Sequence, residues 1–149
     1  MAKFIGVKMI EATPMRASMA LSAGYKIGNA HPDDMGYEVT YPDGYKSWSP
    51  AKEFEKAYYK LEDPTGDTLK ENDIKRFIKG IENVKVGTKT TNTTLTCLTG
   101  FEVHGQAACV KPENFDLNVS ANYARIKAED KIWEGLGFVL QWGKYGLKK

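Results

Sequence analysis

Residues 36–50, GYEVTYPDGYKSWSP, constrain the fold of this chain more than any other stretch. Tyr37, Val39 and Tyr41 alternate with polar residues, which is typical of a half-buried strand. In the PDG triplet at residues 42–44, the proline ring fixes the φ of Pro42, and Gly44 tolerates a positive φ, as a tight turn requires. The aromatic-rich chain beyond the triplet is typical of a second extended segment. This stretch therefore predicts a β-hairpin.

The hairpin is expected to lie between a strand and a helix. Ser49 can cap a helix whose first turn holds Pro50, where the missing N–H costs nothing. Within residues 50–61 the apolar residues recur at helical spacing, so one face would pack on the hairpin and bury Trp48 against Phe54 and Tyr58. A short apolar run predicts a strand at residues 3–12. Together these elements define a predicted N-terminal module at residues 1–62.

A second module is expected at residues 68–149. Residues 63–67, DPTGD, are polar and contain both backbone breakers, so they predict a domain boundary or hinge. Beyond them we expect an amphipathic helix over residues 74–81 and a second hairpin that turns at Thr99-Gly100. The predicted fold class is α+β, with two small modules of antiparallel strands each backed by helix.

A long helix is expected near the C-terminus, ending at Gly135 and Gly137. The apolar residues that mark it are Phe115, Val119, Tyr123, Ile126 and Trp133. The apolar residues beyond the glycines are Phe138, Val139, Leu140 and Trp142. A unit of this size has little surface with which to cover such a tail, so Phe138, Leu140 and Trp142 are predicted to bind a partner or a second copy of the chain.

The net charge and the cysteine spacing of the chain disfavour some classes of function. Lys and Arg number 21 against 19 Asp and Glu, a formal charge of +2, which disfavours binding of duplex DNA by counterion release. The two cysteines, Cys97 and Cys109, lack the spacing of a zinc site. We see neither a signal peptide nor a membrane-spanning run, so we expect two reduced thiols in a cytoplasmic protein.

One group of residues suggests catalysis. If the second hairpin turns on two residues, Cys97, Glu102 and His104 project from one face, and a thiol beside an imidazole suggests an activated nucleophile. A register change of one residue would scatter the three. We therefore expect a buried cysteine beside a polar edge, and no catalytic residues.

Two further groups offer binding chemistry. His31, Asp33 and Asp34 have metal-ligand side chains, but such a group in a loop is more often a solvated turn, so no metal or cofactor is predicted. The aromatic residues of the first hairpin can stack on a base, although core packing is expected for at least two of them. The residues predicted to bind a nucleotide-like ligand are Tyr41, Tyr45, Lys46, Gly24, Gly28 and Asn29.

Residues 95–116 and 128–138 resemble a family of small uncharacterised tailed-phage proteins first noted in enterobacterial podophages. The signature Ala-Cys-Val-x-Pro-x-Asn-Phe-Asp at residues 108–116 is fairly specific. Residues 4–8, 11–15 and 36–57, which include SWSP, look like a module found in many phage proteins. The resemblance implies phage origin and an accessory role, and it brings no assigned activity.

We therefore expect a non-enzymatic phage accessory protein that binds in the host cytoplasm. It would inhibit a host protein or sequester a nucleotide-like ligand, in host takeover or counter-defence. The alternative is a nucleic-acid-binding accessory protein, and the third possibility is a small hydrolase. No membrane partner is expected, and a homo-oligomer is possible.

Overall fold

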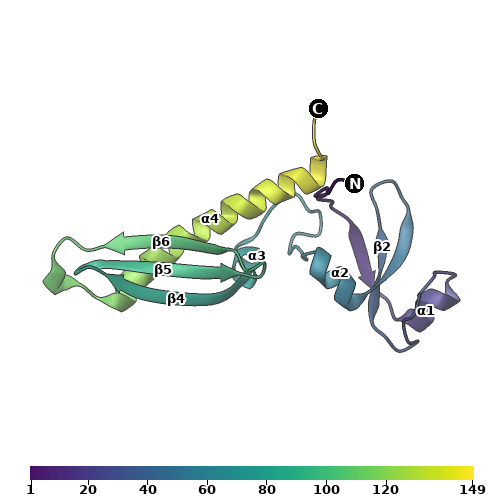
Figure 1. Ribbon diagram of the computed structural model, residues 1–149, viewed down its shortest axis with the longest axis horizontal. Helices are drawn as coiled ribbons and strands as arrows, with labels where there is room; N and C mark the ends of the chain where they lie inside the picture. The colour runs from purple at the N-terminus through teal and green to yellow at the C-terminus, as the bar shows by residue number, and fades with distance from the viewer. The chain divides into compact units, whose positions relative to one another are not determined.

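The computed structural model describes residues 1–149, and the chain divides into two compact units. Unit 1 comprises Met1–Lys60 and Trp142–Lys149, and unit 2 comprises Leu61–Gln141. Each unit holds one three-stranded antiparallel sheet with helices alongside, so the predicted α+β class is confirmed (Figure 1). Independent folding of the two predicted modules stays a prediction.

Unit 1 is built on the predicted hairpin. Its strands, in sheet order, are β1 (Glu11–Pro14), β2 (Gly36–Thr40) and β3 (Lys46–Pro50), and its helices are α1 (Ala17–Ser22) and α2 (Ala51–Ala57). Val39 pairs with Ser47, and Tyr41 N donates to Tyr45 O across the turn. Gly44 has a φ of +88°, which the turn needs and a side chain would resist. The hairpin prediction is therefore confirmed.

The two faces of this sheet meet different helices. Trp48 lies on the face shared with Gly36 and packs with Ala17 of α1. Tyr37, on the opposite face, stacks on Phe54 of α2 with ring centroids 4.2 Å apart. The period-two alternation of strand side chains thus sends one aromatic ring to each helix.

Two predictions for unit 1 are wrong in their boundaries. Strand β1 begins at Glu11, and the apolar run before it lies outside the sheet because β2 is only five residues long and Thr40 already pairs with Glu11. Helix α2 begins at Ala51, because Pro50 is still the last residue of β3, and it ends at Ala57 instead of residue 61. The Ser49 hydroxyl lies 3.4 Å from Pro50 O and makes no cap.

Unit 2 contains the second sheet and the long helix. Its elements are α3 (Glu71–Arg76), β4 (Ile78–Val86), β5 (Thr90–Cys97), β6 (Glu102–Ala108), the 3₁₀ turn η1 (Pro112–Asn114) and α4 (Leu117–Tyr145), whose last residues belong to unit 1. The sheet order is β4-β5-β6. The predicted helix at residues 74–81 is wrong beyond Arg76, because Ile78 and the residues after it pair with β5 instead.

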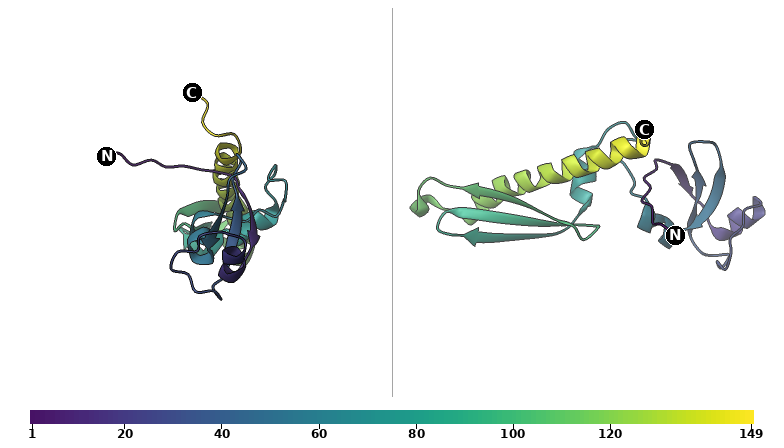
Figure 2. Two further views of the ribbon diagram at one scale, coloured as in Figure 1. Left: turned by 90° about the vertical axis from the view of Figure 1, so that its right-hand side faces the viewer. Right: turned by 45° about the horizontal axis from the view of Figure 1, so that its top comes forward.

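Helix α4 lies along one face of this sheet and approaches it very closely (Figures 1 and 2). A Cβ atom added to Gly105 on β6 would overlap the backbone of Ala124 and Ala128 on α4. The α4 side chains buried here are Ser120, Ala124, Ala128 and Ile132. Small residues on the helix and a glycine on the strand therefore let the two backbones meet, while Leu95 and Val103 fill the core beside them.

Helix α4 does not end at the glycines as predicted. It continues through Gly135 and Gly137 to Tyr145, and Gly146, with a φ of +70°, follows its end. A glycine inside a helix costs only about 1 kcal/mol relative to alanine, which a helix of 29 residues tolerates. The predicted apolar tail is consequently helical.

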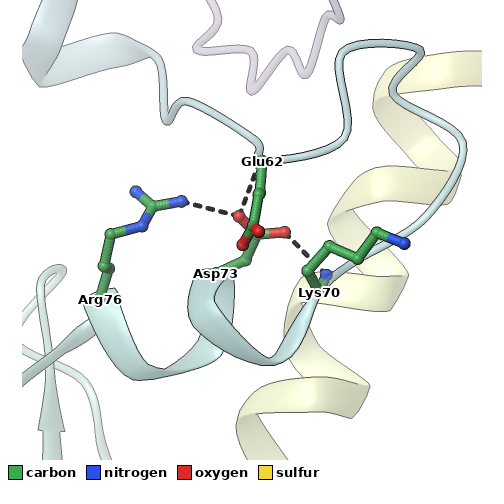
Figure 3. A network of polar contacts seen from close by, with 4 residues as sticks. All are labelled: Glu62, Lys70, Asp73 and Arg76. Atoms are coloured by element: carbon green, nitrogen blue, oxygen red, sulfur yellow. Dashed lines mark hydrogen bonds and ion pairs between the residues drawn. The ribbon is translucent and has the colours of Figure 1, made fainter.

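The segment before α3 is organised by a buried carboxylate. The Asp73 side chain is fully buried and accepts hydrogen bonds from Glu62 N at 2.9 Å and Lys70 N at 2.8 Å (Figure 3). Arg76 Nη2 lies 2.7 Å from the same carboxylate. Asp73 thus ties both ends of a loop to the first turn of α3.

A second aspartate orders the same loop. The exposed Asp63 carboxylate accepts hydrogen bonds from the backbone N and the hydroxyl of both Thr65 and Thr68, which hold the pKa of Asp63 well below its usual range. Residues 63–67, predicted to be a boundary or hinge, are part of this hydrogen-bonded loop and follow the division between the units at Lys60.

We expect Gly105→Ala to destabilise the protein by about 1–3 kcal/mol, because α4 must move away from the sheet to admit a methyl group. Urea unfolding followed by circular dichroism measures this loss. Gly135→Ala is the matched control, since its added Cβ has no atom within 4 Å apart from the backbone of α4 itself, and it should stabilise the protein by about 0.5–1 kcal/mol. Equal stabilities for the two variants would contradict the close contact at Gly105.

We expect Asp73→Ala to cost about 3 kcal/mol, because it leaves the part-buried N–H groups of Glu62 and Lys70 without their acceptor and removes the carboxylate that pairs with Arg76. Limited trypsin digestion should then cut first at Lys60 or Lys70. Asp63→Ala, which removes an exposed carboxylate from the same loop, should have a smaller effect. A wild-type digestion pattern in Asp73→Ala would show that the loop is held by other contacts.

Candidate functional site

The turn of the first hairpin carries the exposed Tyr45 ring and the half-buried Tyr41 ring, and the Lys8 ammonium lies beside them. The rings of Tyr41 and Tyr45 stack with centroids 5.8 Å apart at an interplanar angle of 27°. Lys8 Nζ lies 5.4 Å from the centroid of the Tyr41 ring, a cation–π distance. With Pro42 and Asp43 these residues line a hollow of about 500 Å³. We call Lys8, Tyr41 and Tyr45 the hairpin-tip site.

Local hydrogen bonds hold the shape of this site. The Asp43 carboxylate accepts a hydrogen bond from Tyr45 N at 3.0 Å, which closes the turn in addition to the Tyr41–Tyr45 backbone bond. Tyr58 stacks on Phe54 with centroids 4.9 Å apart, and its pKa is raised by burial and by the neighbouring Tyr41. The Tyr41 ring therefore sits beside an aromatic column, while Tyr45 is 63% exposed.

Lys8 is the residue of this site that the sequence does not reveal. It falls in the run predicted to be a strand, but it lies outside the sheet, where Met9 N donates to Gly143 O at 3.0 Å. This hydrogen bond joins residues far apart in sequence, so no local pattern signals that Lys8 meets Tyr41.

The predicted ligand residues lie in two separate places. Gly28 and Asn29 line another hollow, of about 460 Å³, together with Trp48 and Pro50. This hollow is at the end of the hairpin opposite the turn, since Pro50 pairs with Gly36. Lys46 and Gly24 line neither hollow.

Trp48 is buried, as predicted, but its partners differ from those expected. It packs against α1 instead of Phe54 and Tyr58, because it points to the sheet face opposite α2. Its Nε1 donates to Met15 O at 2.8 Å, and its side chain is only 7% exposed. The cluster around it includes Ala17, Ala20, Met15, Tyr25, Ile27 and Ala30.

The structure separates Cys97 from Glu102 and His104. Cys97 N donates to Phe101 O, and His104 is opposite Thr94, so the register is shifted by one residue from that of a two-residue turn. Cys97 consequently points into the core, where burial raises the pKa of its thiol. His104 Nδ1 lies 2.9 Å from Thr94 Oγ1 on the open face.

The loop residues considered for a metal form a hydrogen-bonded turn. Asp33 N donates to His31 Nδ1 at 3.1 Å, and His31 N donates to the Asp34 carboxylate at 2.9 Å. No group of three His, Cys, Asp or Glu side chains is placed to hold a metal ion. Likewise, none of the helices has the length and apolar character needed to cross a membrane.

The predicted partner residues all lie on α4. Phe138 is 72% exposed, whereas Leu140 and Trp142 are half-buried. A helix turns by about 100° per residue, so Phe138 and Trp142 share one side and Leu140 points to another. They do not form one continuous patch.

We expect Trp48→Ala to destabilise unit 1 by about 3–5 kcal/mol, since it removes the largest side chain of the α1 contact. Trp48→Phe keeps most of the apolar surface and loses only the hydrogen bond to Met15, so its cost should be about 1 kcal/mol. Thermal unfolding of both variants measures the difference. A fully stable Trp48→Ala protein would identify Trp48 as a surface recognition residue.

The comparisons with known proteins agree with the resemblance found in the sequence. The family model described as phage protein (N4 Gp49/phage Sf6 gene 66) family matches residues 68–143, just over half of the chain. This range contains α3, the β4–β6 sheet and most of α4. Searches of curated proteins and of solved structures gave no match. The chain therefore belongs to the phage protein (N4 Gp49/phage Sf6 gene 66) family.

Proposed function

We propose that this phage protein is an accessory protein that acts in the infected host by binding, and that its hairpin-tip site takes a nucleotide-like ligand. The observation that carries the proposal is the placement of the Lys8 ammonium and the exposed Tyr45 ring around one hollow. Sequestering a signalling nucleotide would serve host takeover or counter-defence.

The chemistry of the hollow fits a small planar anion. An exposed tyrosine face stacks on any base, and such stacking contributes about 1–3 kcal/mol per base. Lys8 supplies a positive charge for a phosphate on the same side. The hollow of about 500 Å³ is within the range of small-molecule sites. A formal charge of +2 on the whole chain suits a small anion better than a long duplex.

Binding without turnover is favoured by the side chains available. The hollow contains no histidine, cysteine or glutamate, and its one carboxylate, Asp43, already accepts the Tyr45 N–H. Cys97 and His104, the best nucleophile and base in the sequence, point to opposite faces of the second sheet. These features support a binding protein over a hydrolase.

Thermal-shift measurements with cyclic and linear nucleotides test the proposal. A ligand at 100 times its dissociation constant adds about 2.7 kcal/mol of stability, which is readily measured as a shift in Tm. Tyr45→Ala should abolish the shift in Tm. Lys8→Gln should reduce both the size of the shift and its dependence on salt concentration. Tyr145→Ala is the matched control, because Tyr145 is 59% exposed and lies outside the hollow.

Three results would contradict the proposal. A shift that survives Tyr45→Ala would place the ligand elsewhere, for instance beside Gly28 and Asn29. Conversion of the nucleotide to a new product would identify a hydrolase. Stabilisation by oligonucleotides but by no mononucleotide would favour the nucleic-acid-binding alternative.

A further inference from the structure

Helix α4 carries a second apolar stripe on the side that faces away from the sheet. Its members Val119, Tyr123, Ile126 and Trp133 are 52%, 62%, 52% and 37% exposed, respectively. The buried side of the helix is formed by different residues, Ser120, Ala124, Ala128 and Ile132. We call the exposed set, extended to Leu140, the outer stripe.

The outer stripe has the spacing of a coiled coil. Steps of four and three residues alternate through positions 119, 123, 126, 130, 133, 137 and 140, which are the a and d positions of a heptad repeat. Two positions break the apolar pattern, Asp130 and Gly137. A helix with this stripe is suited to pair with another helix.

Gly137 has no role in the packing of its own chain. Apart from the backbone of α4 itself, no atom lies within 4 Å of the Cβ that an alanine would place there. A glycine inside a helix still weakens it relative to alanine. Its place within the outer stripe therefore suggests that it makes room for a side chain of a neighbouring helix.

The two interruptions select an antiparallel pair of identical helices. In a parallel pair in register, Asp130 would face Asp130 and Gly137 would face Gly137, which brings two carboxylates together and leaves a gap. In an antiparallel pair, Asp130 meets Trp133, whose indole N–H is a donor, and Gly137 meets the large side chain of Ile126.

The flanking charges select the same arrangement. Lys127 and Glu134 occupy successive e positions, both exposed, and antiparallel helices bring e positions together. Lys127 of each copy then faces Glu134 of the other. A parallel pair would instead bring Glu134 of the second helix beside Glu129, a g position whose side chain is 13% exposed and paired with Arg125, so Glu134 would gain no cation as partner.

We propose that this protein forms a homodimer in which the outer stripes of two α4 helices pair antiparallel from Tyr123 to Leu140. The layers are Tyr123 with Leu140, Ile126 with Gly137, and Asp130 with Trp133, each occurring twice about the dimer axis. Lys127–Glu134 ion pairs flank the seam on both sides of the axis.

Sedimentation equilibrium of the full chain and of charge-reversal variants tests the proposal. Lys127→Glu and Glu134→Lys should each raise the dimer dissociation constant about tenfold at low salt, because each turns two attractive pairs into repulsive ones. The double variant should restore the wild-type constant to within about threefold. Lys52→Glu on α2 is the control for the same charge change elsewhere and should have no effect.

Removal of the apolar seam gives a second measurement. Ile126→Glu should make the protein monomeric, whereas Val110→Glu, which changes an 88% exposed valine outside α4, should leave the dimer intact. Circular dichroism spectra of both variants report whether they remain folded.

Three outcomes would overturn the proposal. If the wild-type chain is monomeric across micromolar concentrations, the outer stripe does not mediate self-association. A dimer that is insensitive to Ile126→Glu and to both charge reversals would use another surface. Failure of the double charge reversal to restore a dimer that each single reversal had weakened would exclude the antiparallel arrangement.

Discussion

The contact between Gly105 and the small face of α4 determines the organisation of unit 2. The backbone of β6 approaches Ala124 and Ala128 so closely that no side chain fits between them. This approach brings the core side chains of Leu95 and Val103 under the helix. It also decides which side of α4 is buried, and thereby leaves the larger apolar residues on the opposite side in contact with water.

The register of the second sheet decides which of its reactive side chains share a face. The second hairpin places Cys97 opposite Phe101, so that the thiol belongs to the core face. Glu102 and His104 lie on the other face, where His104 meets Thr94. A shift of one residue would have joined a thiol, an imidazole and a carboxylate. Side chains alternate along a strand, and for that reason the structure separates these groups.

In unit 1 the same alternation distributes the aromatic residues. Trp48 secures α1 on one face of the sheet, and Tyr37 secures α2 on the other through Phe54. Tyr45 lies beyond the strands, in the turn, and is free of this structural task. The exposed Tyr45 ring stacks on Tyr41, the ring that Lys8 contacts, and all three line one hollow, which makes the hairpin tip the better candidate for recognition.

The sequence by itself determined the α+β class, both hairpins, the burial of Trp48 and the phage family, since these depend on local periodicity, turn residues and specific motifs. It misassigned residues 77–81, because an isoleucine-rich run fits a helix or a strand until a pairing partner is known. Only the tertiary structure decided that Lys8 meets Tyr41, and which side of α4 faces the sheet. The apolar residues of α4 most visible in the sequence are those left exposed, because close approach to Gly105 requires small side chains and excludes large ones.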